Sequence, residues 1–243
     1  MSKPLIIVPA FNLDQLASDL LVDSLAAQVN QSFRTIFAVD NCARSADSLQ
    51  ASLGKLSTMF EYSLQITERR RYALANIVNT LYTSVYTDTT WVGILDGDDY
   101  LTCDNVIDRV TQEYDKGARV AWSQFYWDGQ ISSLSAELSQ DANPYWHPWV
   151  SSHFKTFCYR LFLEVPVANF VGPDGKFFRR CYDHALMMPM LWQCHANRYT
   201  TSYIQEPLYF YNNKRSSIPT SEHSGGSREA KLANFIRSRG FVR

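Results

Sequence analysis

The first half of the chain alternates short strand-like runs with segments in which apolar residues recur at helical spacing. The runs cover residues 5–9, 35–39, 62–66, 91–95 and 119–126, and the helical segments cover 14–29, 45–56, 72–86 and 104–116. Short, continuous apolar runs are typical of strands that are buried on both faces. This β-α-β-α order predicts a doubly wound α/β sheet with parallel strands at its centre.

The second half carries weaker signals. Residues 129–147 show few helix or strand signals and are predicted to form a loop, and residues 146–162 are rich in aromatic side chains. The remaining segments predict a buried helix at 183–192 in spite of Pro189, a strand at 203–211, a flexible Gly/Ser segment at 221–227 and a basic amphipathic helix at 228–239.

Composition and charge exclude several classes of protein. The 243 residues carry a formal net charge of −1, so the bulk charge predicts neither nucleic-acid nor membrane binding, although a local basic patch could still provide it. No apolar run approaches the ~20 residues of a membrane span, and residues 5–10 fit a buried strand better than a signal peptide. The five cysteines form no CxxC pair, which indicates free thiols and a cytoplasmic protein.

Polar residues follow three of the predicted strands at the point where each strand ends. Pro9-Ala10-Phe11-Asn12 closes the first strand, Asp40 the second and Asp96-Gly97-Asp98-Asp99 the fourth. In a doubly wound sheet, ligands bind in the crevice outside the carboxyl ends of the strands. We therefore expect the three polar ends to lie side by side in one site.

The segment from Asp96 to Asp99 places three carboxylates at one strand end. They would repel one another unless a cation or hydrogen-bond donors neutralise them, and Mg2+ and Mn2+ prefer carboxylate and phosphate oxygens. Gly97 would let the backbone approach a ligand closely. The alternative is a turn that caps the helix beginning near Asp104. Because two further polar strand ends accompany the cluster, we predict a site for a divalent metal and a diphosphate.

These motifs resemble those of glycosyltransferase family 2, whose members have the GT-A fold. The resemblance rests on residues 6–12, 39–40, 71–77, 94–101, 149–157 and 183–191, which together span most of the chain. The second-half segments are similar to a compact subgroup from bacteria and bacterial viruses. The resemblance implies one GT-A domain, with a nucleotide-sugar-binding half at 1–126 and an acceptor-binding, catalytic-base half at 127–243.

The resemblance also implies roles for individual residues. Pro9, Ala10, Phe11 and Asn12 would line the nucleotide pocket, Asp40 would contact the nucleobase, and Arg71 would lie near the base or the pyrophosphate. Asp98 would ligate Mn2+ or Mg2+ directly, while Asp96 would hold the ribose or reach the metal. Asp183 would be the general base, for which a helix N-cap is the alternative.

Other assignments stay more open. His153 and Lys155 could contact the donor diphosphate or the acceptor, but a structural histidine is an equal alternative. Trp149 could stack on the acceptor or serve only in packing. Tyr211 could also bind the acceptor. It lies in a loop with Lys214 and Arg215 that could close over the donor, or that could be a solvated turn.

Three positions depart from the common pattern of the family. Tyr72 stands where relatives often have glycine, and Tyr182 where many have a second acid. Asp40-Asn41 is less acidic than the usual end of the second strand.

The reaction follows from the chemistry of inversion. The acceptor oxygen attacks the face opposite the leaving diphosphate, a carboxylate on that face removes the proton, and the metal offsets the charge on the diphosphate. We expect transfer from a UDP-sugar to a hydroxymethylated base in DNA, because the subgroup includes viral enzymes of this kind. Basic segments such as 69–71 and 179–180 could bind DNA phosphates, and the target base would be flipped into the site.

Other functions remain as alternatives. The acceptor could instead be a surface polysaccharide or a lipid-linked glycan. The chain could also be a nucleotide-sugar-binding protein, which would not need Asp183. A nucleotidyltransferase would normally carry a Gly-rich loop with Lys or Arg right after the first strand, and residues 9–12 lack it.

Overall fold

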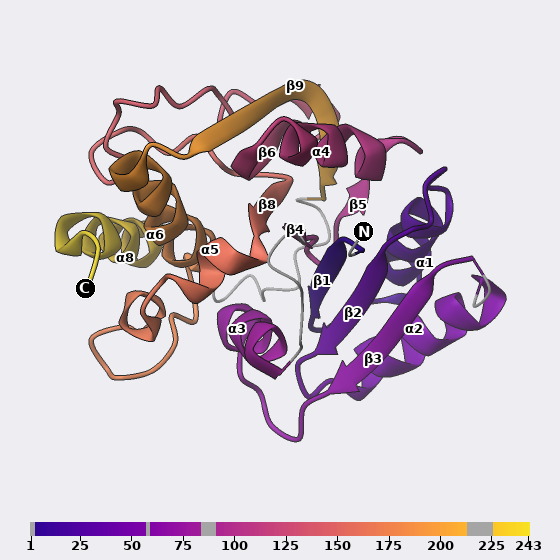
Figure 1. Cartoon of the computed structure of the whole chain (residues 1–243). Helices are drawn as coiled ribbons and strands as arrows, with labels where there is room; N and C mark the ends of the chain where they lie inside the picture. The colour runs from indigo at the N-terminus through magenta and orange to yellow at the C-terminus, as the bar shows by residue number, and fades with distance from the viewer. Residues whose placement is uncertain (1–2, 57–58, 84–90, 213–225) are drawn as a thin grey trace.

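A computed structural model describes residues 3–56, 59–83, 91–212 and 226–243 (Figure 1). Within these residues, one mixed sheet of nine strands runs through the molecule in the order β3-β2-β1-β4-β8-β6-β9-β5, with β7 paired to β6. Strands from both halves of the chain belong to this sheet. No helix in the described ranges has the length and apolar character to cross a membrane.

The first four strands form the parallel half of the sheet. They are β1 (Leu5–Ala10), β2 (Arg34–Val39), β3 (Glu61–Ile66) and β4 (Trp91–Ile94). The helices between them are α1 (Gln15–Ala26), α2 (Ala43–Leu56) and α3 (Ala73–Thr83). The predicted doubly wound arrangement is therefore confirmed, because β2 and β3 are added on one side of β1 and β4 on the other, all parallel to it.

The two faces of the sheet carry separate apolar clusters. Ile6 and Val8 of β1 point into a cluster with α1 and α2, whereas Leu5 and Ile7 point into a cluster with α3. Alternate side chains of a strand leave on opposite faces, so a strand covered on both sides reads as one continuous apolar run. Helix α1 begins where the side chain of Asp14 accepts the backbone N–H of Ala17 at 2.9 Å.

The chain after β4 extends the sheet with both antiparallel and parallel pairs. Its elements are β5 (Tyr100–Leu101), α4 (Val106–Asp115), β6 (Ala118–Trp127), β7 (Gln130–Ile131), β8 (Lys155–Cys158), α5 (Tyr159–Leu163), η1 (Val167–Phe170), α6 (Tyr182–Asn197), β9 (Thr200–Tyr211) and α8 (Gly226–Arg239). Strand β8 lies antiparallel between β4 and β6, and β9 runs parallel to β6. Strand β8 thereby joins the two halves.

Several expectations from the sequence need correction. The first helix ends at Ala26 instead of Val29, and α6 continues to Asn197, five residues past the predicted end. The aromatic segment at 146–162 contains β8 and α5, which the sequence pattern does not predict. Most of the Gly/Ser segment at 221–227, together with Lys214 and Arg215, lies outside the described residues. All five cysteines are free, as expected.

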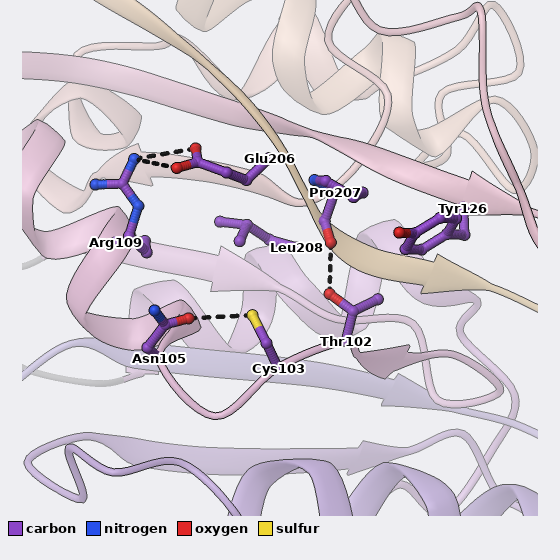
Figure 2. A pocket seen from close by; sticks show the side chains of 8 residues that line it. All are labelled: Thr102, Cys103, Asn105, Arg109, Tyr126, Glu206, Pro207 and Leu208. Carbon is purple, nitrogen blue, oxygen red and sulfur yellow. Dashed lines mark hydrogen bonds and ion pairs between the residues drawn. The ribbon is translucent and has the colours of Figure 1, made fainter.

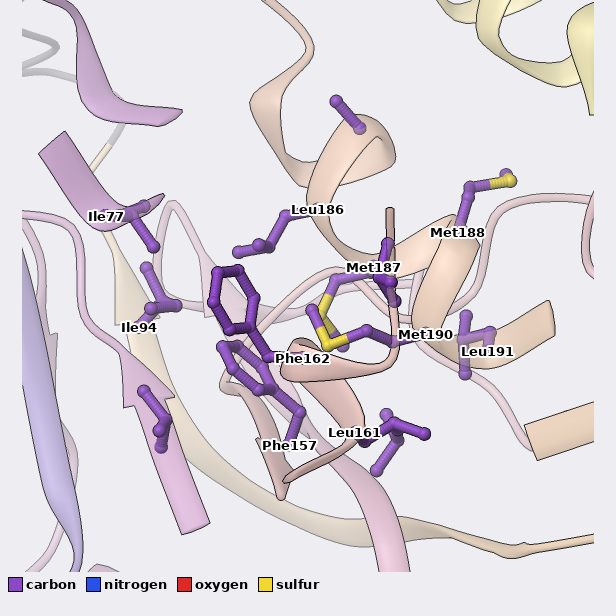
Figure 3. Packing of buried hydrophobic residues seen from close by; sticks show 14 of the residues in the cluster. Ile77, Ile94, Phe157, Leu161, Phe162, Leu186, Met187, Met188, Met190 and Leu191 are labelled. Carbon is purple, nitrogen blue, oxygen red and sulfur yellow. The ribbon is translucent and has the colours of Figure 1, made fainter. Parts of the chain in front are cut away.

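Helix α6 is anchored in the core on the α3 side of the sheet (Figure 3). Leu186, Met187 and Met190 are fully buried and belong to one cluster with Phe157 of β8 and Phe162 of α5. Methionine side chains are unbranched and fill irregular gaps between such rings. This packing fixes the first turn of α6, and with it Asp183, beside the carboxyl end of β4.

Candidate active site

A cavity of about 550 Å³ lies at the carboxyl ends of β1, β2 and β4. Its walls include the three polar strand ends, with Pro9, Ala10 and Phe11 from β1, Asp40 from β2, and Asp96, Gly97, Asp98 and Asp99 from β4. The first turn of α6 forms the opposite side, with Tyr182, Asp183 and His184. The three polar strand ends therefore lie together in one cavity, as expected from the sequence.

Asp40 is held in place at one end of the cavity. Its side chain is nearly buried and accepts the backbone N–H groups of Arg71 at 2.5 Å and Tyr72 at 2.9 Å. The guanidinium of Arg70 lies 3.8 Å from the ring centroid of Phe11 and 4.6 Å from that of Tyr72. A fixed carboxylate therefore stands beside a flat stack of arginine on an aromatic ring.

Two of the residues expected at this end do not line the cavity. The side chain of Arg71 is exposed and contributes only its backbone N–H to Asp40, whereas the neighbouring Arg70 lines the cavity. Asn12 is also exposed, and its side chain accepts a hydrogen bond from Arg44 at 3.4 Å. Arg70 and Arg71 are adjacent in the same loop, and the path of its backbone determines that Arg70 faces the cavity.

The three carboxylates of the acidic cluster have different surroundings. Asp99 is buried and accepts the hydroxyl of Tyr209 at 2.5 Å and the backbone N–H of Asn212 at 2.8 Å. Burial, together with the nearby charges of Asp98 and Asp96, raises the pKa of Asp99 well above its ordinary value. Asp98 is half-buried in the cavity wall. Both residues line the cavity, but Asp99 is the more buried of the two and has protein partners of its own.

Asp96 accepts hydrogen bonds from several side chains. Tyr182 donates its hydroxyl to Asp96 Oδ1, and the hydroxyl of Tyr209 lies 3.3 Å from Oδ2. The ammonium of Lys155 lies 3.3 Å from the same Oδ2. Asp96 is thereby oriented by residues from β8, β9 and α6.

Lys155 is a completely buried cation that links Asp96 to Asp183. Its Nζ lies 2.7 Å from Asp183 Oδ1, 3.1 Å from the Tyr182 hydroxyl and 3.3 Å from His153 Nδ1. Burial alone would lower the pKa of Lys155, but the charges of Asp183 and Asp96 outweigh it and raise the pKa above its ordinary value. One ammonium group therefore neutralises carboxylates from opposite walls of the cavity.

His153 is buried next to this lysine. Its ring stacks on Tyr209 at 4.5 Å and on Tyr211 at 5.4 Å between centroids. Burial and the charge of Lys155 lower the pKa of His153 well below its ordinary value. The imidazole is therefore neutral at pH 7, which suits hydrogen bonding or metal ligation and excludes a role as a second cation.

The first turn of α6 presents Asp183 to the cavity. Cys181 is the N-cap residue and Asp183 lies inside the first turn, so the N-cap alternative for Asp183 is wrong. The next residue, His184, also lines the cavity, and Trp149 stacks on it at 4.1 Å. Trp149 is absent from the cavity wall and reaches it only through its contact with His184, whereas Tyr211 lines the cavity.

Sequence comparison finds no protein-family profile and no curated protein that matches this chain. Solved structures do match. S. aureus TarS is 16% identical with a TM-score of 0.64, covering 88% of this chain and 37% of TarS. The mannosyltransferase PcManGT from Pyrobaculum calidifontis, bound to GDP-Man and Mn2+, is 14% identical with a TM-score of 0.63, covering 97% of this chain and 63% of that protein.

Glucosyl-3-phosphoglycerate synthase from Mycobacterium tuberculosis, solved with Mn2+, UDP and glucosyl-3-phosphoglycerate, is 14% identical with a TM-score of 0.62; the match covers 99% of this chain and 81% of the synthase. The chain has the GT-A glycosyltransferase fold. The matched region makes up 37% of TarS and 63% of PcManGT, so the chain spans less than two thirds of the length of either protein.

Within this GT-A fold, the acidic cluster offers suitable ligands for a divalent metal. Asp96, Asp99 and His153 each place a ligand atom within 4.8 Å of the others, and oxygen and imidazole ligands suit Mn2+. Lys155 and Tyr209 already contact these three residues, so this buried group has partners of its own. Asp98 lines the cavity beside Asp96. Carboxylate oxygens of this kind are the ligands that a hard divalent cation prefers.

Gly97 allows the ends of β4 and β1 to approach closely. A Cβ atom at this position would lie 3.0 Å from the carbonyl oxygen of Pro9, 3.1 Å from Leu13 and 3.2 Å from the Cα of Ala10. These distances are shorter than ordinary van der Waals contacts, so a side chain at residue 97 would push the two strand ends apart.

The sequence pattern does not reveal several residues of the site. Tyr182 and Tyr209 contact predicted site residues although the sequence assigns them no role, and Arg70, which lies over Phe11, is marked in the sequence only as part of a basic segment. The tail helix α8 also reaches the cavity, where Glu229 forms an ion pair with Arg180 at 3.2 Å. Contacts between segments so distant in the sequence follow from the tertiary fold alone.

A smaller hollow of about 250 Å³ lies between β9 and the start of α4 (Figure 2). Its charged side chains pair with each other, because Arg109 contacts both carboxylate oxygens of Glu206 at 2.9 and 3.0 Å. Thr102 donates its hydroxyl to the carbonyl of Pro207. The charges of Arg109 and Glu206 are thus paired within the protein, and we assign the hollow no chemistry.

Proposed function

We propose that this protein is an inverting glycosyltransferase that moves a sugar from a nucleotide-sugar to an acceptor hydroxyl. The carrying observation is the placement of Asp183 and Asp96 in one cavity, 2.7 and 3.3 Å from the same buried ammonium of Lys155. A donor site and a candidate base are thereby held at a fixed separation. Fixed positions of this kind favour reaction because the reacting groups need no further ordering.

The donor in this proposal is a UDP-sugar. The side-chain oxygens of Asp40 accept hydrogen bonds, so in this proposal Asp40 pairs with a base that presents an N–H group, as uracil does at N3. The flat stack of Arg70 on Phe11 supplies surfaces on which a base can pack. TarS has been solved with UDP-GlcNAc, which is consistent with a uridine nucleotide in this fold.

The base in this proposal is Asp183. Its carboxylate removes the proton of the acceptor hydroxyl while the acceptor oxygen forms its bond to the anomeric carbon and the bond to the diphosphate breaks. Lys155 holds the carboxylate in place through the 2.7 Å ion pair. Asp96 and Asp98 would hold Mn2+ or Mg2+, which supplies positive charge for the leaving diphosphate. No covalent intermediate is needed, so the site needs no second nucleophile.

The acceptor in this proposal is a hydroxymethylated base in DNA. Phe125, Trp127 and Tyr211 line the cavity together with the base candidate Asp183, and Trp127 lies edge-on to Tyr211 at 5.4 Å. Aromatic walls suit a flipped nucleobase. Arg179 also lines the cavity and is exposed, so it can reach a phosphate.

A transfer assay read by mass spectrometry tests this proposal. UDP-, GDP- and CDP-sugars are each offered with plain DNA, hydroxymethylated DNA and a panel of oligosaccharides, in the presence of Mn2+. A gain of one sugar mass on hydroxymethylated DNA with a UDP-sugar is the expected result. A gain on oligosaccharides alone would refute the DNA acceptor and retain the transferase, and no gain on any acceptor would count against transferase activity.

A further inference from the structure

The buried side chain of Asn76 leaves both of its polar atoms without a partner. Asn76 lies on α3, is 3% exposed and is one of the residues that line the cavity of the candidate active site. Among the described residues, neither its Nδ2 nor its Oδ1 has a hydrogen-bond partner. Buried side chains such as Ser151 and Thr35 lack a partner at one atom, but Asn76 is unpaired at both.

An unpaired amide is costly inside a protein. Nearly all buried polar groups in folded proteins are hydrogen-bonded, and each exception calls for an explanation. Burial removes the amide from water without returning an equivalent bond, so an apolar side chain of the same size would be more stable at this position. A ligand that fills the cavity and bonds to the amide explains why this position holds an asparagine.

The position of Asn76 indicates which group of the ligand it contacts. The backbone N–H of Asn76 bonds to the carbonyl of Tyr72, whose own N–H is bound to Asp40. Asn76 thus lies one helical turn, about 5.4 Å, along α3 from the residue that fixes Asp40. Because Asp40 is the partner proposed for the nucleobase, the group next along the ligand is a sugar ring.

We propose that Asn76 binds a ring hydroxyl of the nucleotide-sugar, an inference that rests on the proposed function. A hydroxyl donates one hydrogen bond and accepts others, so it satisfies both the Oδ1 acceptor and the Nδ2 donor of an amide. A phosphate oxygen only accepts and would leave Oδ1 unpaired. The ribose and the transferred sugar both carry such hydroxyls, and the choice of ligands in the experiment separates them.

The test compares Asn76→Leu with the wild type by calorimetric titration and thermal unfolding. We expect the dissociation constant of the UDP-sugar to rise about tenfold, because the variant loses one or two hydrogen bonds to the ligand. We also expect Tm to rise by about 2–4 °C, because the unpaired amide is gone. A rise in Tm with weaker binding is the signature of a residue kept for its ligand.

Controls and ligands make the outcome specific. Asn79→Leu on the same helix changes an exposed asparagine, and it should leave the affinity unchanged. Asn76→Ala removes the amide without adding bulk, and it should weaken binding as Asn76→Leu does. If the hydroxyl belongs to the ribose, both UDP and the UDP-sugar lose affinity; if it belongs to the transferred sugar, only the UDP-sugar does.

Two results would overturn this inference but leave the proposed function intact. If wild type and both Asn76 variants bound the UDP-sugar equally, the amide would serve no ligand, as when an ordered water satisfies it. A lower Tm with unchanged affinity would make Asn76 a structural residue. If the wild type bound none of the UDP-, GDP- and CDP-sugars with Mn2+, the proposed function would fail as well, and the inference with it.

Discussion

The ammonium of Lys155 lies 2.7 Å from Oδ1 of Asp183, and the lysine side chain is completely buried. Lys155 comes from β8 and Asp183 from the first turn of α6, so one ion pair ties the central sheet to the helix that carries the candidate base. Because the same ammonium contacts Asp96, any change at Lys155 affects both sides of the cavity.

Lys155→Met should destabilise the fold and abolish transfer. The substitution leaves Asp96 and Asp183 facing each other without their shared cation, and breaking a buried pair in this way typically costs about 3 kcal/mol or more. Urea unfolding would measure the free energy of unfolding. Lys116→Met is the matched control, because Lys116 pairs with Glu113 at an exposed position and its loss should cost about 0.5 kcal/mol or less.

The Asp183→Asn variant should still bind the donor but should no longer catalyse sugar transfer. Asparagine keeps the shape of the side chain but does not take a proton from an acceptor, so kcat should fall by about 100- to 10,000-fold. Calorimetry should find the affinity for the UDP-sugar within about twofold of the wild type. Full transfer activity in this variant would refute Asp183 as the base.

Gly97→Ala should weaken donor binding and lower stability. The new methyl group would lie 3.0 Å from the Pro9 carbonyl oxygen and displace the two strand ends, at a cost of about 1–3 kcal/mol. Gly54→Ala on α2 meets nothing within 4 Å and should instead stabilise the protein by about 0.5 kcal/mol. If thermal unfolding gave the same change in Tm for Gly97→Ala and Gly54→Ala, the close contact between the two strand ends at Gly97 would not contribute to stability.

His153 should make stability depend on pH in the acidic range. Burial and Lys155 lower the pKa of His153 well below 6.5, so the unfolded chain binds a proton that the folded chain excludes. Its contribution to stability is therefore complete above pH 6.5 and is lost as the pH falls below that value, by up to about 1.4 kcal/mol per pH unit. His153→Phe should flatten this dependence between pH 6.5 and 5, and His195→Gln on the last turn of α6 should not.

Much of the parallel half of the fold could be predicted from the sequence. Leu5 to Val8 form a continuous apolar run because both faces of β1 are covered, and that run is visible without a structure. Asp40 and Asp96 were placed together by a rule about parallel sheets, and they do line one cavity.

The remaining features depend on contacts between distant segments. Strand β8 begins with a charged residue, Lys155, whose burial is possible only because Asp96 and Asp183 approach it from other elements. The choice of Arg70 over Arg71 at the cavity is set by the path of a loop, and the two unpaired atoms of Asn76 become apparent only when its neighbours are known. No local pattern encodes these relationships.

We propose that the cavity binds a nucleotide-sugar through a metal held by Asp98 and Asp96. A calorimetric titration of the protein with UDP-sugars, with Mn2+ and after chelation, tests it most directly. We predict binding with Mn2+, at least tenfold weaker binding without it, and loss of the metal effect in Asp98→Ala. Equal affinity with and without Mn2+, or no binding of any UDP-sugar, would contradict the claim.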